Sequence, residues 1–333
     1  MIIDELNMVT EHHKDRCPLY KDYVMTFFGD QEVRSLGDLP FLPVKAFKKF
    51  EMKSIPEEEI YKVMRSSGTS GEYSQIFLDK ETAQLQTRAL VNSFKYNFGG
   101  NRFPMLIIDT ESTVRNRMNF SARTAAINGF SMFSRGRCFA LDDDLSMNHD
   151  RVTNFLSQNA GKKIFVFGFT FLVWSALIEV LQKTSAKIDL SNSFLLHGGG
   201  WKKLESLRIS NEDFKEKIKE STGCSSVHNY YGMVEQTGTV FIECKNGRLH
   251  ASENSSAIVR DPITHRLLDH SHTGLLQVFS TIQKSYPGHS LLTEDVGRTF
   301  EGSDCGCGCN RVIVEIDGRL ARAEVRGCSD AYS

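Results

Sequence analysis

Short apolar runs alternate with segments of helical character between residues 100 and 232, and this alternation restricts the fold more than any other feature of the sequence. The apolar runs cover residues 106–109, 163–169, 194–196 and 227–232. The segments of helical character between them are 119–128, which we expect to stop at Gly129, 172–183 and 211–222. Strands that alternate with helices favour a parallel sheet with right-handed crossovers. The sequence therefore predicts a parallel α/β core.

After residue 240 the sequence consists mainly of short predicted strands separated by turns. Lys245-Asn246-Gly247 and Asp317-Gly318 are typical of such turns. We expect these strands to form an antiparallel sheet or small barrel appended to the α/β core. The predicted parts are an N-terminal helical segment, the α/β core, the antiparallel β sub-domain and a C-terminal tail, at residues 1–60, 61–240, 241–317 and 318–333.

Composition and charge narrow the class of protein. The 333 residues carry a formal net charge of −1, which gives no support to nucleic-acid binding. No stretch reaches the roughly 18 apolar residues that a spanning helix needs, so we expect no membrane span. The N-terminus, Met1-Ile2-Ile3-Asp4-Glu5, lacks the apolar region of a signal peptide. Without a secretion signal, the eight cysteines are expected to be reduced thiols in a cytoplasmic protein.

A hydroxyl-rich glycine loop lies between two short predicted strands near the start of the core. Its residues are Ser66, Ser67, Gly68, Thr69, Ser70 and Gly71. Glycine lets the backbone approach a ligand closely, and backbone N–H and hydroxyl groups then bind phosphate oxygens. The loop lacks the Gly-Lys-Ser/Thr ending and the following helix of a Walker A loop. A plain flexible turn is the alternative, since the same residue types favour turns.

Further motifs follow this loop in a fixed order. They are Tyr230–Glu235, Leu292–Arg298 and Asp317–Arg319, with the sequences YYGMVE, LTEDVGR and DGR. The ordered set resembles the adenylate-forming superfamily of acyl-CoA ligases and related synthetases. His197–Lys202 (HGGGWK) and Arg322–Ser329 (RAEVRGCS) make the chain similar to the acyl-protein synthetases of bacterial luminescence systems, which activate the fatty acid in fatty acid reductase.

The resemblance implies an α/β fold, the large domain of adenylate-forming enzymes, with the second, mobile domain reduced to a short tail. The implied activity is that of an ATP-dependent, AMP-forming acid–thiol ligase. A long-chain fatty acid would be activated as an acyl-adenylate, and a cysteine thiolate of the protein would take the acyl group as a thioester. The implied partner is an acyl-CoA-reductase-like protein, in a multienzyme fatty acid reductase complex.

The resemblance also assigns roles to single residues. Residues 66–71 would hold the β- and γ-phosphates, although the lysine that usually follows the loop is missing until Lys80. Glu235 would bind magnesium, a hard cation suited to carboxylate oxygen. The remaining nucleotide contacts would be Gly198, Gly199, Gly200, Tyr231, Gly232, Asp295 and Arg319, the last two at the ribose. Lys202 is the candidate replacement for the lysine that the mobile domain supplies in the superfamily.

Cys328 is the acyl acceptor that the resemblance implies. The thiolate is the reactive form of cysteine, and the nearby Arg326 would favour it electrostatically. Two other functions stay open, namely an acyl- or aryl-CoA ligase and an inactive nucleotide-binding assembly subunit. The terminal cysteine argues against the first, and the presence of Glu235 and Asp295 argues against the second.

A second thiol feature is the alternation of cysteine and glycine at Cys305, Cys307 and Cys309. On an extended strand these cysteines would face one side, which suits a soft metal such as zinc. A tetrahedral site would need a fourth ligand, for which Cys244 and His250 are candidates. The alternative is a glycine-rich turn with reduced thiols.

The predicted strand at 163–169 carries an aromatic row. Phe165, Phe167 and Phe169 share the period-2 spacing of one strand face, and Phe171 continues it. Such a row either packs in the core or forms the wall of an apolar ligand pocket, and the sequence favours the core.

Overall fold

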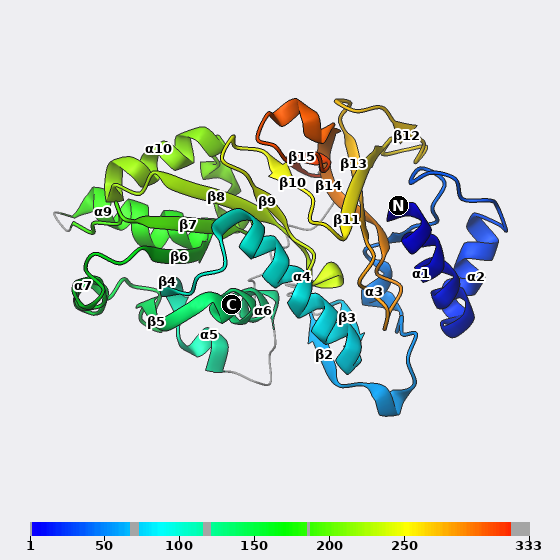
Figure 1. The fold of residues 1–333 in the computed structure, drawn as a ribbon, viewed down its shortest axis with the longest axis horizontal. Coiled ribbons are helices and arrows are strands. Elements are labelled where there is room, and N and C mark those ends of the chain that lie inside the picture. Colours follow the sequence, from blue (N-terminus) through cyan, green and yellow to red (C-terminus); the bar gives the residue numbers. More distant parts are fainter. Residues whose placement is uncertain (1, 67–72, 116–120, 185–186, 321–333) are drawn as a thin grey trace. The chain divides into compact units, whose positions relative to one another are not determined.

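The computed structural model of the chain describes residues 2–66, 73–115, 121–184 and 187–320 (Figure 1). These residues divide into two compact units. The first unit consists of residues 2–97 and 232–320, and the second of residues 98–231. The four-part division of the sequence remains a prediction.

The second unit is built on parallel strands in the order β5-β4-β6-β7-β8. Their bounds are β4 Phe103–Thr110, β5 Ser134–Leu141, β6 Ile164–Phe169, β7 Ser193–Gly198 and β8 Ser226–Tyr231. The α-helices are α5 Ser112–Arg115, α6 Ala122–Phe130, α7 His149–Gln158, α8 Thr170–Leu172, α9 Glu179–Lys183 and α10 Asn211–Thr222, with a π-helical segment, Val173–Ile178, between α8 and α9. The predicted parallel α/β core is therefore confirmed.

Apolar side chains cover both faces of this parallel sheet. On one face Val166 of β6 shares an apolar cluster with Ile218 of α10. On the other face Phe130 of α6 meets Phe165 and Phe167, at ring-centroid distances of 6.4 and 5.0 Å. Figure 1 shows α10 and α6 on opposite sides of these strands. Burial on both faces explains why the strands have nearly continuous apolar sequences.

The aromatic row of β6 is part of the core. Phe165, Phe167 and Phe169 are each at most 1% exposed. Phe165 stacks on Phe194 of the neighbouring strand β7, with ring centroids 5.0 Å apart. The phenyl rings therefore pack between the sheet and its helices, as the sequence favours.

Local capping explains where two of the helices begin and end. Helix α10 has the predicted bounds, because Ser210 caps its first turn and Gly223 takes a left-handed conformation, with φ of 75°, after its last residue. Helix α6 begins after Ser121, which caps it. The predicted stop at Gly129 is wrong, because α6 continues to Phe130 and into the 3-10 turn Ser131–Phe133. The predicted start at residue 119 lies outside the described residues.

The first unit contains an antiparallel sheet in the order β12-β11-β13-β14-β15-β10-β9. Its strands are β9 Phe241–Glu243, β10 Leu249–His250, β11 Ser255–Arg260, β12 Leu267–Leu268, β13 Gly274–Ser280, β14 Ser290–Phe300 and β15 Ile313–Arg319. The two-residue strand β1 (Leu42–Pro43) adds to β14 in parallel. The antiparallel sheet expected after residue 240 is thus confirmed.

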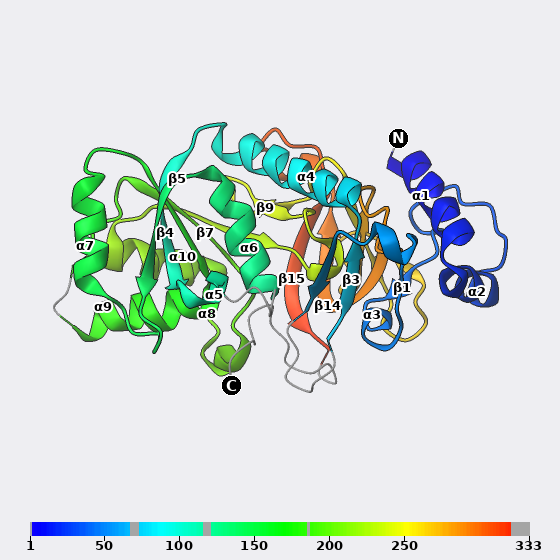
Figure 2. The same cartoon turned by 90° about the horizontal axis from the view of Figure 1, so that it is seen from below.

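The N-terminal part of the first unit is mainly helical. Its elements are α1 Ile2–Arg16, α2 Pro18–Phe27, α3 Ala46–Lys49, the hairpin of β2 Lys62–Arg65 and β3 Gln75–Leu78, and α4 Lys80–Phe98. Helices α1 and α2 lie side by side (Figure 2). Among the described residues, no helix combines the length and the apolar character that crossing a membrane requires. The cytoplasmic location remains a prediction.

Candidate active site

Glu235 lies in a buried 3-10 turn of the first unit, η5 (Val234–Gln236), and is 6% exposed. Ser74 Oγ donates a hydrogen bond of 2.5 Å to Glu235 Oε1. Burial raises the pKa of the Glu235 carboxyl, and the hydrogen bond from Ser74 opposes that rise. A carboxylate beside a hydroxyl is a hard oxygen donor set, so these side chains fit a magnesium ion.

Hydrogen bonds and one close backbone approach fix the main chain of this turn. Tyr286 Oη donates to the carbonyl of Glu235 at 2.9 Å. Gln236 Nε2 donates to the carbonyls of Val278 and Gly288, at 3.1 and 2.9 Å. A Cβ at Gly288 would come within 2.8 Å of the Glu235 carbonyl oxygen, so the absence of a side chain there allows the approach. The carboxyl of Glu235 is therefore carried on a rigid support.

Asp295 and Arg319 face each other on the neighbouring strands β14 and β15. Arg319 Nε donates a hydrogen bond of 2.9 Å to Asp295 Oδ1. The aspartate is buried and the arginine exposed. Both act on the carboxyl of Glu235, because the positive charge of Arg319 lowers its pKa and the charge of Asp295 raises it. The structure thus brings Glu235, Asp295 and Arg319 into one electrostatic environment.

Gly297, two residues after Asp295, has a packing role in the same motif. A Cβ at this position would lie 2.1 Å from the carbonyl oxygen of Glu315 on β15. The register between β14 and β15 shifts between Val296 and Gly297. A larger residue would push the two strands apart where they carry Asp295 and Arg319.

Ser66 closes the hairpin that carries the predicted phosphate loop. Its backbone N–H donates to the carbonyl of Ser74 at 3.1 Å, and its Oγ accepts from the Ser74 N–H at 2.8 Å. The base of the loop is therefore joined, through Ser74, to Glu235. The loop residues Ser67, Gly68, Thr69, Ser70 and Gly71 lie outside the described residues.

The triple glycine of the second unit begins at the carboxyl end of β7. A Cβ at Gly198 would lie 2.6 Å from the carbonyl oxygen of Tyr230 on β8, its register partner. Gly199 has φ of +80°, and a Cβ there would lie 2.5 Å from the ring of Phe169. Gly200 has φ of +69° with no atom within 4 Å of its Cβ position. The first two glycines permit close packing, while the third leaves open space beside the backbone.

The other predicted site residues are placed as follows. Tyr231 is the last residue of β8 in the second unit. Gly232 belongs to the first unit, and a Cβ there would lie 3.3 Å from Val240. The backbone of Lys202 begins the 3-10 segment η4 (Lys202–Leu207), and its side chain is outside the described part of the structure. Cys328 lies outside the described residues.

The cysteine–glycine alternation forms a glycine-rich turn, which was one of the two alternatives that the sequence left open, and not an extended strand. Residues Gly302–Cys305 form a 3-10 turn, and Gly306 and Gly308 have φ of 65° and 94°. These positive φ angles turn the chain, so Cys309 does not share a side with the other two cysteines. The structure groups Cys305 and Cys307 with the two candidate fourth ligands, Cys244 and His250, instead of with Cys309.

Sequence reasoning missed Ser74 and Tyr286, which support Glu235. It also missed a buried ion pair in the second unit between Asp109, near the end of β4, and Arg123 of α6. Arg123 Nε donates to Asp109 Oδ2 at 2.5 Å, and Arg123 also donates to Asp109 Oδ1. The acidic end of the apolar run at 106–109 was the available sequence signal for this pair, because a charge at the end of a buried strand needs a partner.

Comparisons with known proteins identify the family of the chain. The family model described as acyl-protein synthetase, LuxE, matches residues 2–333. A long-chain-fatty-acid–luciferin-component ligase from Vibrio harveyi is 23% identical over 335 residues, covering 97% of this chain and 85% of the relative. The ligase of the same name from Aliivibrio fischeri is 22% identical over 323 residues, covering 95% of this chain and 84% of the relative.

Solved structures share the fold. An open conformation of 2-hydroxyisobutyryl-CoA ligase, in complex with 2-HIB-AMP and CoA, has a TM-score of 0.73 at 15% identity. The matched region covers 96% of this chain and 69% of the ligase chain. ATP-bound MatB from Rhodopseudomonas palustris has a TM-score of 0.53 at 16% identity, and the matched region covers 80% of this chain and 49% of the MatB chain. The fold is that of the adenylate-forming ligases. With the family model matching nearly the whole sequence, the chain belongs to the LuxE family of acyl-protein synthetases.

Proposed function

We propose that this protein activates a long-chain fatty acid with ATP and takes the acyl group onto its own Cys328 as a thioester. Family membership and the names of the Vibrio and Aliivibrio relatives support a fatty acid as the substrate. The observation that carries the proposal is the hydrogen-bonded pair of Glu235 and Ser74 close to Asp295 and Arg319. Glu235, Asp295 and Arg319 stand in the motifs by which the chain resembles the adenylate-forming enzymes, and the resemblance implies that these motifs bind ATP.

In the first step a carboxylate oxygen of the fatty acid attacks the α-phosphorus of ATP. An O–P bond forms, the bond to the β-phosphate oxygen breaks, and pyrophosphate leaves with the electron pair. Magnesium, when bound, would neutralise charge on the phosphates. Glu235 would hold the ion, Ser74 would orient the carboxylate, and Asp295 would accept hydrogen bonds from the ribose hydroxyls. The residues at 66–71, Gly198–Gly200, Tyr231 and Gly232 would make the remaining nucleotide contacts, with Lys202 as a cation near the phosphates.

In the second step the thiolate of Cys328 attacks the acyl carbonyl carbon. A C–S bond forms, the C–O bond to the phosphate breaks, and AMP leaves. The thiol proton must be lost before attack, and Arg326 would favour the thiolate through its charge. The acyl group would then pass to an acyl-CoA-reductase-like partner, as in a multienzyme fatty acid reductase complex.

Exchange of labelled pyrophosphate into ATP tests the first step. We expect exchange that depends on both magnesium and a long-chain fatty acid, and that is retained in Cys328→Ser, because the cysteine acts only after adenylation. Absence of exchange with every acid from short to long chains would contradict the proposal and favour an inactive nucleotide-binding subunit.

A CoA ligase is the second candidate, because the structural neighbours include a ligase bound to CoA. The two functions differ in the final thiol. Release of AMP that requires added CoA, and that continues in Cys328→Ser, would favour the CoA ligase. We expect instead that AMP release without CoA stops after about one turnover per chain, because each chain offers one Cys328.

A further inference from the structure

Four soft ligands surround a common point in the first unit. The Sγ atoms of Cys244, Cys305 and Cys307 and one ring nitrogen of His250 all lie within 4.8 Å of one another. Cys244 Sγ is 3.4 Å from Cys305 Sγ, and Cys307 Sγ is 3.4 Å from His250 Nε2. Tetrahedral zinc with Zn–S bonds of about 2.3 Å and Zn–N bonds of about 2.0 Å holds its ligand atoms roughly 3.5–3.8 Å apart. The observed spacing is close to that geometry.

We propose that this protein binds a structural zinc ion through Cys244, His250, Cys305 and Cys307. Three thiolates and an imidazole are one of the ligand sets of structural zinc sites, and thiolate ligands select zinc over hard ions such as magnesium. Four protein ligands complete a tetrahedron and leave no position for a substrate, so the ion would have a structural role. This inference is independent of the proposed function.

The orientation of the imidazole supports the site. His250 Nδ1 lies 3.0 Å from the carbonyl oxygen of Arg311. Because a carbonyl only accepts, Nδ1 carries the proton and the lone pair of Nε2 faces Cys307. A hydrogen bond from the second ring nitrogen to a backbone carbonyl is the usual support of a zinc-bound histidine.

Backbone N–H groups point at two of the sulfur atoms. The N–H of Asn246 donates to Cys244 Sγ, and the N–H of Cys309 donates to Cys307 Sγ, each at 3.4 Å. Such bonds stabilise a sulfur that carries negative charge. Both donors stand two residues after the cysteine that they serve, so each of the two turns holds its own ligand.

The four ligands come from two separate segments of the first unit. Cys244 and His250 belong to the β9–β10 hairpin and its turn, whereas Cys305 and Cys307 lie in the connection between β14 and β15. Asn246 Nδ2 donates to the carbonyl of Cys305 at 2.8 Å, which already joins the two segments. Zinc would cross-link them beside the short pairing of β10 with β15.

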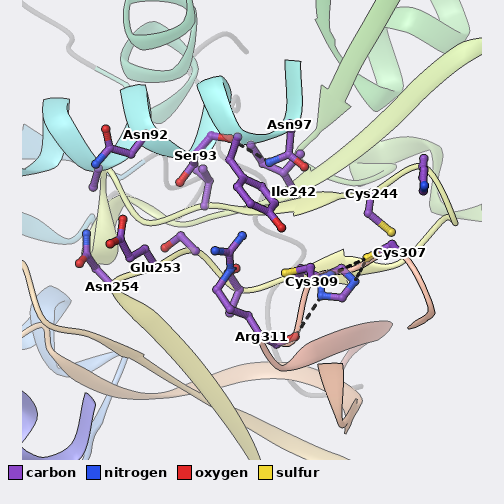
Figure 3. A pocket seen from close by; sticks show the side chains of 17 residues that line it. Asn92, Ser93, Asn97, Ile242, Cys244, Glu253, Asn254, Cys307, Cys309 and Arg311 are labelled. Carbon is purple, nitrogen blue, oxygen red and sulfur yellow. Dashed lines mark hydrogen bonds between the residues drawn. The ribbon is translucent and has the colours of Figure 1, made fainter. Parts of the chain in front are cut away.

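The fourth cysteine of this region, Cys309, provides a matched control. Cys309 is buried, lies two residues from Cys307 and is not part of the four-ligand group. In Figure 3 the sulfur atoms of Cys244 and Cys307 lie close together at one end of a pocket of about 480 Å³, and Cys309 lies apart from them. Substitution of Cys309 by serine keeps the backbone N–H that bonds to Cys307.

The direct test is metal analysis of the full-length protein, produced with zinc in the medium and purified without a metal-chelating tag. We expect about one zinc per chain in the wild type and in Cys309→Ser, and a large loss in Cys244→Ser and in Cys305→Ser, because a three-ligand site binds zinc more weakly. Removal of zinc with a chelator should lower Tm, and zinc, but not magnesium, should restore it.

Cobalt substitution identifies the ligands. We expect thiolate-to-cobalt charge-transfer absorption and the intense visible bands of a tetrahedral site, with the charge-transfer intensity reduced by about a third in each single cysteine variant. The proposal is overturned if the wild type contains no zinc and gives no such bands with cobalt, or if peptide mapping shows a Cys244–Cys305 disulfide instead. These wild-type measurements decide the question even if a variant does not fold.

Discussion

The Glu235 carboxyl is buried, accepts a hydrogen bond from Ser74 and lies in a turn fixed by Tyr286 and Gln236. Burial of a carboxylate is costly unless an opposite charge or hydrogen bonds compensate it. Arg319 supplies part of that compensation, whereas Asp295 opposes it. A divalent cation would supply the rest, so this residue should matter more for catalysis than for stability.

Glu235→Gln tests this expectation. The amide keeps the size of the side chain but cannot serve as an anionic ligand. We expect magnesium-dependent pyrophosphate exchange to fall by about 100-fold or more, in the range seen when one group that stabilises transition-state charge is removed. The Tm should stay the same or rise, because a buried charge is lost. The matched control is Glu253→Gln, at an exposed residue of the same unit, and equal activity of the two variants would contradict the role of Glu235.

Ser74→Ala tests the orienting role of the serine. The hydrogen bond from Ser74 lowers the pKa of the Glu235 carboxyl, so its removal raises that pKa. The acidic limb of the pH–rate profile of pyrophosphate exchange should therefore move to higher pH, with a loss of about 10-fold or more in apparent magnesium affinity. Ser74→Thr keeps a hydroxyl and should retain the wild-type profile. If Ser74 had only a structural role, the acidic limb of the Ser74→Ala profile would lie at the same pH as that of the wild type.

At the scale of elements, the sequence predicted strands and helices where local signals agree. Helix α10 has both caps and an apolar stripe, and β6 is a continuous apolar run, so both were predictable. The Ser74–Glu235 contact joins residues 161 positions apart and depends on tertiary folding, which local patterns do not encode. For the cysteine segment the sequence left open a period-2 strand or a glycine-rich turn, because its local pattern fits both, and Gly306 and Gly308 turn the chain there.

The link between β4 and α6 depends on the buried pair of Asp109 and Arg123. The two residues are 1% and 5% exposed, and Thr113 Oγ1 also donates to Asp109 at 2.7 Å. Arg123→Met would leave a buried carboxylate without its cation. We expect a loss of about 3–5 kcal/mol in the free energy of unfolding, measured by urea denaturation.

Two variants serve as controls for the buried pair. Arg115→Met removes an exposed arginine that pairs with Glu111 at 2.9 Å, and should cost less than about 1 kcal/mol. The double variant Asp109→Asn with Arg123→Met should recover much of the stability, because no unpaired charge remains buried. A loss in Arg123→Met as small as that in Arg115→Met would show that the pair does not hold β4 to α6.

Stability should depend on pH through buried histidines, of which His13 and His289 lie together in the first unit. His13 of α1 contacts Ser54 Oγ at 2.7 Å and the Gln283 carbonyl at 2.9 Å, and its ring stacks on His289 at 4.9 Å. Burial lowers the pKa of His289 to about 3, and burial together with His289 lowers that of His13. Both rings are therefore neutral in the folded protein at neutral pH.

Acid should therefore destabilise the fold before the carboxylates titrate. The unfolded chain binds protons at histidine below pH of about 6.5, whereas the folded chain does not, so stability is full above that pH and is lost as the pH falls toward 3. The slope is up to about 1.4 kcal/mol per pH unit for each histidine. His289→Gln cannot bind the proton and should flatten the slope of urea midpoint against pH between 6.5 and 5. His272→Gln, at an exposed residue, should leave this slope unchanged. Equal slopes in the wild type, His289→Gln and His272→Gln would contradict a role of the buried histidines.

We expect ATP and magnesium to drive acylation of this chain at Cys328. The most direct measurement is the intact mass of the protein after incubation with ATP, magnesium and fatty acids of increasing chain length. We predict a mass increase of one acyl group that hydroxylamine removes, that is absent in Cys328→Ser and that persists in the neighbouring control Ser329→Ala. An unchanged adduct in Cys328→Ser, or no adduct with any acid, would contradict acylation at Cys328.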